Sequence, residues 1–261
     1  MASHPRLARL ALAAIAAAVL PVAQAAAKCL PIAEAPARVM PAALPDPGTV
    51  RLTFLGHSSF LIETSGGASA VTDYAGYALE TVPDAVTMNN AHRSHYTDFP
   101  DPAITHVLRG WATEGLMVTH DVTIEDLRIW NVPTNVRDVG GTRINGNSIF
   151  VFEVDGLCIA HLGHLHHTLT DVHLGELGKI DVLLAPADGG YTLSHDLLVE
   201  VIGQIGPSLV IPMHYFGTGR LSNLLALLEA EGFAVEIIED HETTVSRLTM
   251  PHRTIRVLGD G

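Results

Sequence analysis

The chain has 261 residues, 48% of them hydrophobic and 16% charged, which is the composition of a globular protein rather than a disordered one. The length suits one large domain or two small ones. An excess of 28 acidic over 15 basic residues gives a formal net charge of −13, which disfavours nucleic acid and anionic membrane surfaces as partners. The sequence also contains 15 histidines, and clustered histidines point to metal.

The first 25 residues have the three parts of an export signal. Arg6 and Arg9 supply positive charge, residues 10–20 form an apolar run, and Ala23-Gln24-Ala25 is a small-x-small cleavage site. The alternative, a membrane-spanning helix, needs about 20 apolar residues, and this run is shorter. We therefore expect export, in a bacterium to the periplasm, and no stable membrane anchor after removal of the signal peptide.

Residues 26–49 are rich in proline and alanine and are typical of an extended leader, so the folded domain is expected over residues 50–261. Cys29 lies in this leader, and the preceding Ala27-Lys28 does not match a lipobox, which argues against a lipid anchor. Cys158 is the only other cysteine. One disulfide bond is possible, although a domain of this size does not need one.

Short β-forming runs dominate the first half of the domain and alternate with helical patterns in the second half. Strands are expected at residues 51–55, 59–63, 69–72, 85–88, 105–108, 115–119, 126–132, 148–154, 157–161, 180–185, 208–212, 234–238 and 254–257. The first three form a β-meander, and Asp155-Gly156 joins a hairpin. One helix follows a Ser194 cap and extends to Ile205, and a second covers residues 221–231. This order predicts sheets with helices packed outside.

Three groups of histidines each follow the C-terminal end of an apolar strand. The first group holds His92 and His95, the second is a run from His161 to His167, and the third is His214. Imidazole suits zinc and similar ions. Each group alone could be solvated loop residues or a core histidine with satisfied hydrogen bonds. Together, three such groups at strand ends indicate a metal site.

The order of these motifs resembles the metallo-β-lactamase superfamily, and within it the ascorbate-6-phosphate lactonase-like branch. The resemblance covers about residues 50–258 and rests on the segments LGHSSFLIE (residues 55–63), VTD (71–73), IAHLG (159–163), DVLLAP (181–186) and IPMHY (211–215). It implies an α/β fold, the four-layer αβ/βα sandwich, with the site along one edge between two sheets.

The metal motif departs from that of the family. Where the family has His-x-His-x-Asp-His, this sequence has Asn90, His92, Ser94 and His95. The position of the family's metal-bridging aspartate holds His164. The resemblance carries over as metal ligands His92, His95, His161 and His214, with His164 in a ligand position of changed chemistry. Asn90 could still bind weakly through its amide oxygen.

This ligand set implies a divalent metal, with zinc the first candidate. Anionic ligands offset the charge of two neighbouring ions, and neutral imidazoles do not, so we expect one tightly held ion rather than two. His92, His161 and His164 could hold it with an open water position. His95 and His214 could complete a second, weaker site or act as catalytic acid, base or substrate contacts.

Other residues near these motifs have two interpretations each. His57 could line the cleft or only satisfy a turn, and Asp73 could orient a ligand histidine or be a solvated strand-end acid. Asp98 could replace the missing carboxylate if Ser94 begins a helix, although a solvated acid is the simpler reading. The loop of residues 188–191 could border the substrate or only turn the chain. Tyr215 could donate a proton or pack as an aromatic.

The leading hypothesis is a periplasmic metal-dependent hydrolase that uses a metal-bound hydroxide on a small ester, lactone, amide or phosphoester. The alternative is a catalytically degenerate metal- or ligand-binding protein on the same fold, which the missing histidine and aspartate of the motif favour. A third hypothesis, a metal carrier, comes from the histidine run at 161–167. The sequence predicts neither the substrate's identity nor the oligomeric state.

Overall fold

The computed structural model describes residues 48–77, 82–112 and 116–259. The proposed export signal and leader residues 26–47, Cys29 included, lie outside these ranges. Regular structure begins at Thr49, one residue before the expected start of the domain.

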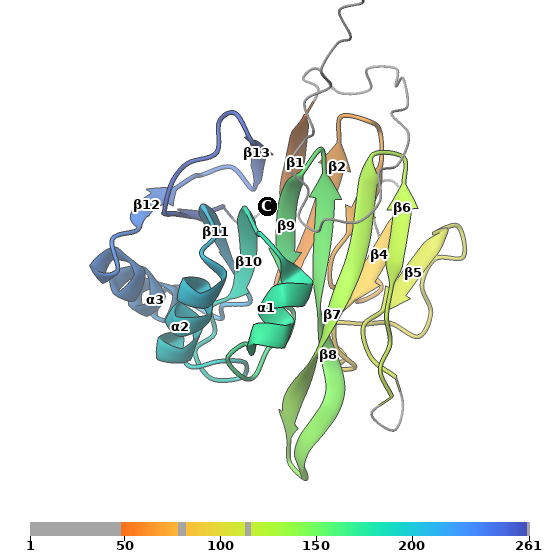
Figure 1. Ribbon diagram of the computed structural model, residues 1–261, viewed down its shortest axis with the longest axis horizontal. Coiled ribbons are helices and arrows are strands. Elements are labelled where there is room, and N and C mark those ends of the chain that lie inside the picture. Colours follow the sequence, from red (N-terminus) through yellow and green to blue (C-terminus); the bar gives the residue numbers. More distant parts are fainter. Residues whose placement is uncertain (1–47, 78–81, 113–115, 260–261) are drawn as a thin grey trace, which may run out of the picture.

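The described residues form two β-sheets (Figure 1). In spatial order, the six-stranded sheet contains β13 (Glu242–Ser246), β1 (Thr49–Gly56), β2 (Ser59–Thr64), β3 (Ser69–Val71), β4 (Ala85–Met88) and β5 (His106–Arg109). The eight-stranded sheet contains β12 (Ala234–Ile237), β14 (Thr254–Val257), β11 (Leu209–Met213), β10 (Val182–Pro186), β9 (Leu157–His161), β8 (Gly141–Val154), β7 (Leu127–Asp138) and β6 (Asp121–Ile124).

The pairing of these strands explains where the chain can build a site. β1, β2 and β3 form the predicted antiparallel meander, and β3, β4 and β5 then run parallel. In the other sheet, β9, β10 and β11 are parallel neighbours. Parallel strands bring their carboxyl ends to a common edge, and side chains in the loops that follow can meet there.

Three helices cover the outer face of the eight-stranded sheet: α1 (Asp171–Leu177), α2 (His195–Ile205) and α3 (Thr218–Ala230) (Figure 1). The side chain of Ser194 caps α2 by accepting a hydrogen bond from the backbone N–H of Leu197, as predicted. Leu198 of α2 and Leu224 of α3 are buried in one cluster with Leu183 of β10. Each such side chain contributes roughly 1.5–3 kcal/mol by leaving water.

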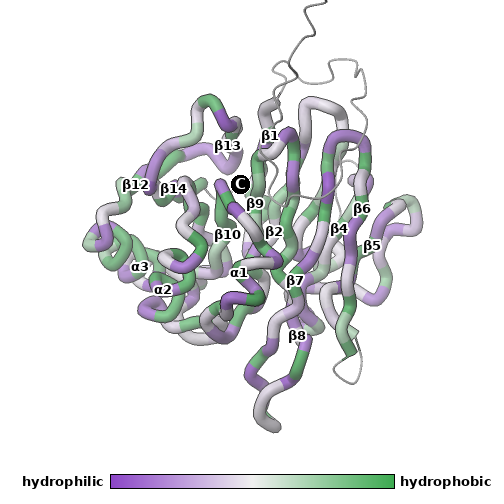
Figure 2. Tube along the Cα trace, in the orientation of Figure 1, coloured by the Kyte–Doolittle hydropathy of each residue, from purple (hydrophilic) through white to green (hydrophobic). Residues whose placement is uncertain are grey.

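A second core fills the space between the sheets. Leu52 and Ile62 from the six-stranded sheet pack in one cluster with Ile129 and Phe152 from the other. β1 alternates buried with more accessible residues along most of its length, whereas β9, β10 and β11 are buried at every position. This difference follows from the helices, because strands covered on both faces are apolar throughout. Figure 2 shows the resulting hydrophobic stretches along β9 and β10.

The α/β sandwich predicted from the sequence is confirmed. Within the described ranges, its helices cover only the eight-stranded sheet. The outer face of the six-stranded sheet carries a smaller cluster in which Val86 and Met88 pack with the loop residues Tyr74 and Ile104. The predicted hairpin at Asp155-Gly156 is also confirmed, and both of its residues have positive φ, as a tight two-residue turn requires.

Several details differ from the sequence-based expectation. Residues 116–119 form no strand, so the strand expected there is wrong. β7 and β8 are longer than predicted and project from the body as an extended hairpin (Figure 1). α1, β6 and β13 were not predicted; α1 has only seven residues, one of them Gly175, which weakens its helical pattern.

Cys158 forms a disulfide bond, and the one other cysteine of the sequence, Cys29, lies outside the described ranges. None of the helices in the described part of the chain has the length and apolar character needed to span a membrane.

Candidate metal centre

Loops at the ends of separate strands bring the candidate side chains together. His57 lies in the turn between β1 and β2, His95 follows β4, and His214 follows β11. Their imidazole centroids are 4.4–5.2 Å apart. Each ring offers one nitrogen, and these three nitrogens lie within 4.8 Å of one another. We call these three residues the histidine centre.

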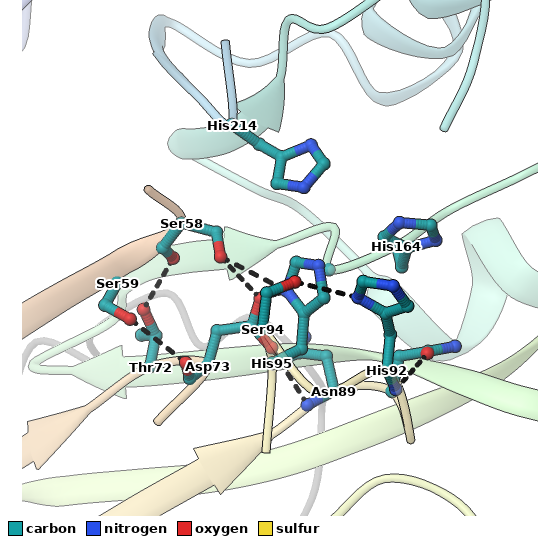
Figure 3. Close-up of polar contacts among 12 residues, drawn as sticks. Ser58, Ser59, Thr72, Asp73, Asn89, His92, Ser94, His95, His164 and His214 are labelled. Carbon is teal, nitrogen blue, oxygen red and sulfur yellow. Dashed lines mark hydrogen bonds and ion pairs between the residues drawn. The ribbon is translucent and has the colours of Figure 1, made fainter. Parts of the chain in front are cut away.

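His95 is oriented by a buried carboxylate. Asp73, which follows β3, accepts a hydrogen bond from Nδ1 of His95 and another from the hydroxyl of Ser58 at 2.8 Å (Figure 3). The backbone N–H of Asn89 donates to the other carboxylate oxygen at 3.1 Å. Burial opposes ionisation of Asp73, but the charge of His95 outweighs it and holds the pKa of this carboxyl well below its usual range.

Burial lowers the pKa of His95, and the Asp73 carboxylate more than compensates, so the net shift of this pKa is upward. With Nδ1 of His95 engaged by Asp73, only Nε2 remains for another partner. Nε2 of His95 is buried and has no hydrogen-bond partner among the residues that the structure describes. A buried polar atom without a partner costs free energy, which makes this nitrogen a candidate metal-binding atom.

His214 repeats this arrangement from the other sheet. Its Nδ1 lies 3.0 Å from the carboxylate of Asp188, which follows β10. Asp188 also accepts hydrogen bonds from the side chain of Thr192 and from three backbone N–H groups. Burial disfavours the ionised carboxyl, but these bonds, that from His214 foremost, keep the pKa of Asp188 well below its usual range. Two of the three histidines are thus held by buried carboxylates.

The backbone at the centre adopts an uncommon conformation. His57, Asp73 and His214 have φ of 54°, 51° and 53°, in the left-handed region that L-residues seldom occupy. The backbone N–H of His214 donates to the carbonyl of His57 at 2.6 Å, which links the two loops directly. Residues in such conformations gather at functional sites, where the surrounding structure holds them.

His161, predicted as a metal ligand, is engaged in a different way. Its ring is fully buried, Nε2 donates to the carbonyl of Ser58 at 2.7 Å, and Nδ1 accepts from the N–H of Gly163 at 3.1 Å. Both nitrogens are therefore used by the protein, and neither offers a lone pair to an ion. In this arrangement His161 packs beneath the centre and links β9 to the β1–β2 turn.

The first histidine group also differs from expectation. His92 is exposed and its Nδ1 pairs with the hydroxyl of Ser94 at 2.8 Å. The amide of Asn90 is used locally: its oxygen accepts from the N–H of His92 and its nitrogen donates to the carbonyl of Gly146. The predicted weak metal contact through that oxygen is therefore not available. His92 flanks the centre, 5.7 Å from the ring of His95 between centroids.

His164 lies against the centre without joining the group of three. Its ring centroid is 5.0 Å from that of His95 and 5.5 Å from that of His214, in edge-on contacts. Burial, together with the neighbouring His95, lowers the pKa of His164 to about 3. Figure 3 shows His164 beside His92 and His95, with His214 entering from the opposite side.

The remaining predictions have mixed outcomes. Asp73 does orient a histidine, as one of its two interpretations predicted. No helix begins at Ser94, so Asp98 stays an exposed acid away from this network. Tyr215 packs against the helix-covered core, which favours its packed-aromatic interpretation. The loop of Asp188 was expected to border the substrate or only to turn the chain, and its contact with His214 was not predicted. The position of Asp188 after a buried strand, like that of Asp73, was the available signal for that contact.

An α/β sandwich with histidines gathered where strand ends of its two sheets meet is the arrangement of a metallo-β-lactamase fold. The chain belongs to the beta-lactamase superfamily: the model of the family described as "Beta-lactamase superfamily domain" matches residues 51–214. The superfamily predicted from the sequence motifs is thereby confirmed, while the lactonase-like branch stays a prediction.

Two relatives of the chain are both described as metal-dependent hydrolases. A UPF0173 metal-dependent hydrolase of Methanoregula boonei is 28% identical over 215 residues, covering 75% of this chain and 93% of the relative. Another, from Methanosphaerula palustris, is 26% identical over 184 residues, covering 64% and 84%. The crystal structure of a metallo-beta-lactamase superfamily protein from Thermotoga maritima, named for a proposed Zn-dependent hydrolase activity, matches with a TM-score of 0.59 and 25% identity, covering 81% of this chain and all of that one.

Proposed function

We propose that the protein is an exported metal-dependent hydrolase with a single divalent ion, zinc as first candidate, held by His57, His95 and His214. The observation that carries this proposal is the buried, unpartnered Nε2 of His95, in a ring that offers one ligand atom within 4.8 Å of a ligand atom of each of the other two histidines. Three imidazoles with a fourth, open position are a workable catalytic zinc site.

The imidazole nitrogens of the histidine centre are suited to bind a metal ion as neutral ligands. A metal-binding imidazole commonly donates its other N–H to a carboxylate, which fixes the tautomer and the ring orientation. His95 has this partner in Asp73 and His214 has it in Asp188. His57 has no such carboxylate contact in the described network and is the most accessible of the three. We assign to it the weakest contribution to metal affinity.

Charge balance supports one ion rather than two. The buried carboxylates of Asp73 and Asp188 contact the ligand histidines rather than the ion itself. Their two negative charges together balance the charge of one divalent cation. The positions where the family has further anionic ligands hold Ser94 and His164, so a second cation would lie uncompensated beside the first. One ion per chain is also the number expected from the sequence.

The residues of the site would hold the ion, orient the ligand histidines and form hydrogen bonds with them. A divalent ion here would supply a Lewis acid that polarises a substrate oxygen and lowers the pKa of a coordinated water to about 7. Asp73 keeps the proton of His95 on Nδ1, and Asp188 does the same for His214, so both rings present Nε2 toward the centre. In the proposed site His95 and His214 therefore act as ligands, and this role replaces the acid or base role considered from the sequence.

The substrates we propose are small esters, lactones, amides or phosphoesters, which is the chemistry of hydrolytic attack on a polarised carbonyl or phosphoryl group. The names of the relatives support the reaction class. Export is supported by the signal-like N-terminal sequence and by the disulfide bond at Cys158, since disulfides persist in oxidising compartments.

The second candidate is a catalytically degenerate binding protein on the same fold. The replacement of two motif positions by Asn90 and Ser94, and the local use of the Asn90 amide, favour it. The two candidates differ in turnover, because a degenerate protein would hold the metal without hydrolysing any member of the proposed substrate classes.

Metal content of the mature protein, purified without a histidine tag, tests the proposal. The key variant is His95→Asn, because the asparagine amide can still donate to Asp73 from the position of Nδ1 while the ligand atom Nε2 is lost. The matched control is His252→Gln, an exposed histidine outside the network. We expect about one ion per chain in the wild-type and control proteins and loss of at least 90% in His95→Asn, with unchanged circular dichroism.

Equal metal content in His95→Asn and the control would show that the ion lies elsewhere and would overturn the assignment. With the metal in place, a screen of ester, lactone, amide and phosphoester substrates separates the two candidates. Hydrolysis that is lost with the metal supports the hydrolase, and metal retention without turnover supports the binding protein.

A further inference from the structure

His164 occupies the sequence position where the family has a metal-bridging aspartate. A series of hydrogen bonds determines which nitrogen of its ring carries the proton and faces the histidine centre. This hydrogen-bond chain begins at the backbone N–H of Arg137 in β7, which donates to Nδ1 of His166 at 2.6 Å. Nε2 of His166 then lies 2.8 Å from Nδ1 of His164. The ring of His164 is the last member of this chain and contacts His95 and His214.

The direction of the chain is set at its backbone end. A backbone N–H can only donate, so Nδ1 of His166 must accept and carries no proton. In the neutral ring the proton of His166 is therefore on Nε2. The backbone carbonyl of Tyr191 also accepts from this ring, and at 2.8 Å Nδ1 of His164 can take part only as an acceptor of the same N–H. Nδ1 of His164 accepts this bond, and the proton of neutral His164 is forced onto its own Nε2.

We infer that His164 presents an N–H donor to the histidine centre instead of a metal ligand, and that it binds an oxygen atom of the substrate there. The inference deepens the proposed function and rests on it for the substrate. His164 is then a substrate-binding residue, and His166 is a positioning residue that acts through it. The family's carboxylate at this position would repel an anionic oxygen, whereas an N–H donor attracts one.

The protein thus favours substrates with an anionic or strongly polar oxygen beside the reacting group, such as a phosphoester or a carboxylate-bearing ester. Arg137 also ties β7 to the Asp188 loop, since its guanidinium donates to the carbonyl of Thr192 in that loop. β7 therefore fixes both the donor residue His164 and the loop that carries the carboxylate partner of His214.

The tautomer of His164 is measured directly in metal-free protein labelled with ¹⁵N-histidine, by long-range ¹H–¹⁵N correlation, with the signal assigned from a His164→Gln variant. We expect a single tautomer with the proton on Nε2. In His166→Phe the donor to Nδ1 is lost, and we expect a mixture of the two tautomers. The matched control is His167→Phe. His167 also accepts from a backbone N–H of β7, that of Asn135, but has no bond to His164.

A proton on Nδ1 of His164 in the wild-type protein would overturn the inference, as would a spectrum of His164 that is the same in His166→Phe and His167→Phe. A second measurement excludes ligation: His164→Gln is expected to keep the zinc content of the wild type, whereas His95→Asn loses it. Loss of zinc in folded His164→Gln would make His164 a ligand and refute its role as a donor. If wild-type protein binds no zinc, the proposed function fails, and the tautomer measurement still decides the donor assignment.

Discussion

Nδ1 of His214 lies 3.0 Å from Oδ2 of Asp188, and the other carboxylate oxygen of Asp188 accepts backbone N–H groups from Gly190, Tyr191 and Thr192. The loop after β10 therefore holds this carboxylate in place with its own backbone, and the carboxylate in turn holds His214. The ring orientation of His214 depends on an anion that is fixed before any ion binds.

The substitution Asp188→Asn tests this dependence. The amide keeps the size of the side chain but loses the charge, so His214 loses its fixed tautomer and some of its basicity. We expect zinc affinity to fall by about 10- to 100-fold, measured by competition with a chromophoric chelator. The control is Asp196→Asn, an exposed acid in the first turn of α2. Equal affinities in the two variants would mean that the carboxylate does not support the ligand.

Gly163 tests the packing beneath the centre. It has φ of 59°, and a Cβ at this position would lie 2.5 Å from Cβ of Asn89. We expect Gly163→Ala to lower the free energy of unfolding by roughly 1–3 kcal/mol, because the residue is strained and the neighbouring atoms belong to a buried side chain. Urea denaturation measures this change.

The matched glycine is Gly175 in α1, where an added Cβ would have no atom within 4 Å. Gly175→Ala is expected to raise the free energy of unfolding by up to about 1 kcal/mol, because alanine favours the helix. A loss of stability in Gly175→Ala, or none in Gly163→Ala, would contradict the packing described here.

The metal-free protein should lose stability as the pH falls from 7 towards 4.5. Burial lowers the pKa of His164 to about 3 and that of His166 to about 4, from an ordinary value of 6.5. Below pH 6.5 the unfolded chain takes up protons at these two positions and the folded chain does not, so folding becomes less favourable. His95, whose pKa is raised, acts in the opposite direction, but it is one group against several, because the pKa of His57 is also lowered, to about 4, and that of the buried His161 is lowered as well.

Urea midpoints at pH 7 and pH 5 in the presence of a chelator measure this effect. His166→Phe removes one of the groups that take up a proton on unfolding and should show a smaller decrease between the two pH values than the wild type. A wild-type midpoint that is the same or higher at pH 5 would contradict the expectation.

The substitution His164→Asp tests the charge at the position of the family's aspartate. An added carboxylate beside the centre should tighten zinc binding by at least tenfold through charge attraction. It should also weaken the binding of inorganic phosphate to the zinc-loaded protein, because like charges repel. His164→Asn has nearly the same size as the aspartate without its charge, so zinc binding should change by no more than about threefold. It also removes the imidazole N–H, so phosphate binding should weaken, but less than in His164→Asp. Equal changes in the two variants would exclude charge as the cause.

Most of the strands, the antiparallel meander and the two longer helices were predictable because their signals are local. Alternating apolar residues, the Ser194 cap and the Asp155-Gly156 turn each act within a few residues of the chain. The edge strand β13 had no such signal, because it is defined by its pairing with β1, almost the whole length of the domain away. Three of its five residues are buried, but only Val245 among them is apolar, so the strand has little apolar periodicity of its own.

The sequence singled out two of the three histidines of the centre, His95 and His214, and left His57 with two interpretations. His161 and His214 look alike in the sequence, each at the end of a buried strand. They differ in what surrounds them: a carbonyl and an N–H use both nitrogens of His161, while a carboxylate uses only one nitrogen of His214. These partners come from distant segments, so the spacing of histidines along the chain cannot distinguish a ligand from a packing residue. His57, a single histidine in a turn, had no neighbouring histidine to mark it.

The three histidines of the centre come from the β1–β2 turn, the loop after β4 and the loop after β11, and they meet only where the two sheets are packed together. A partly folded chain therefore has no preformed centre, and metal selection happens at the end of folding. The proposed export would place that moment after translocation. Geometry, ligand type and the available ions together determine which first-row metal a site takes, so the compartment in which this chain folds would influence which ion it carries. Refolding the purified protein in solutions that differ only in their metal ions would then yield molecules of one fold with different reactivities.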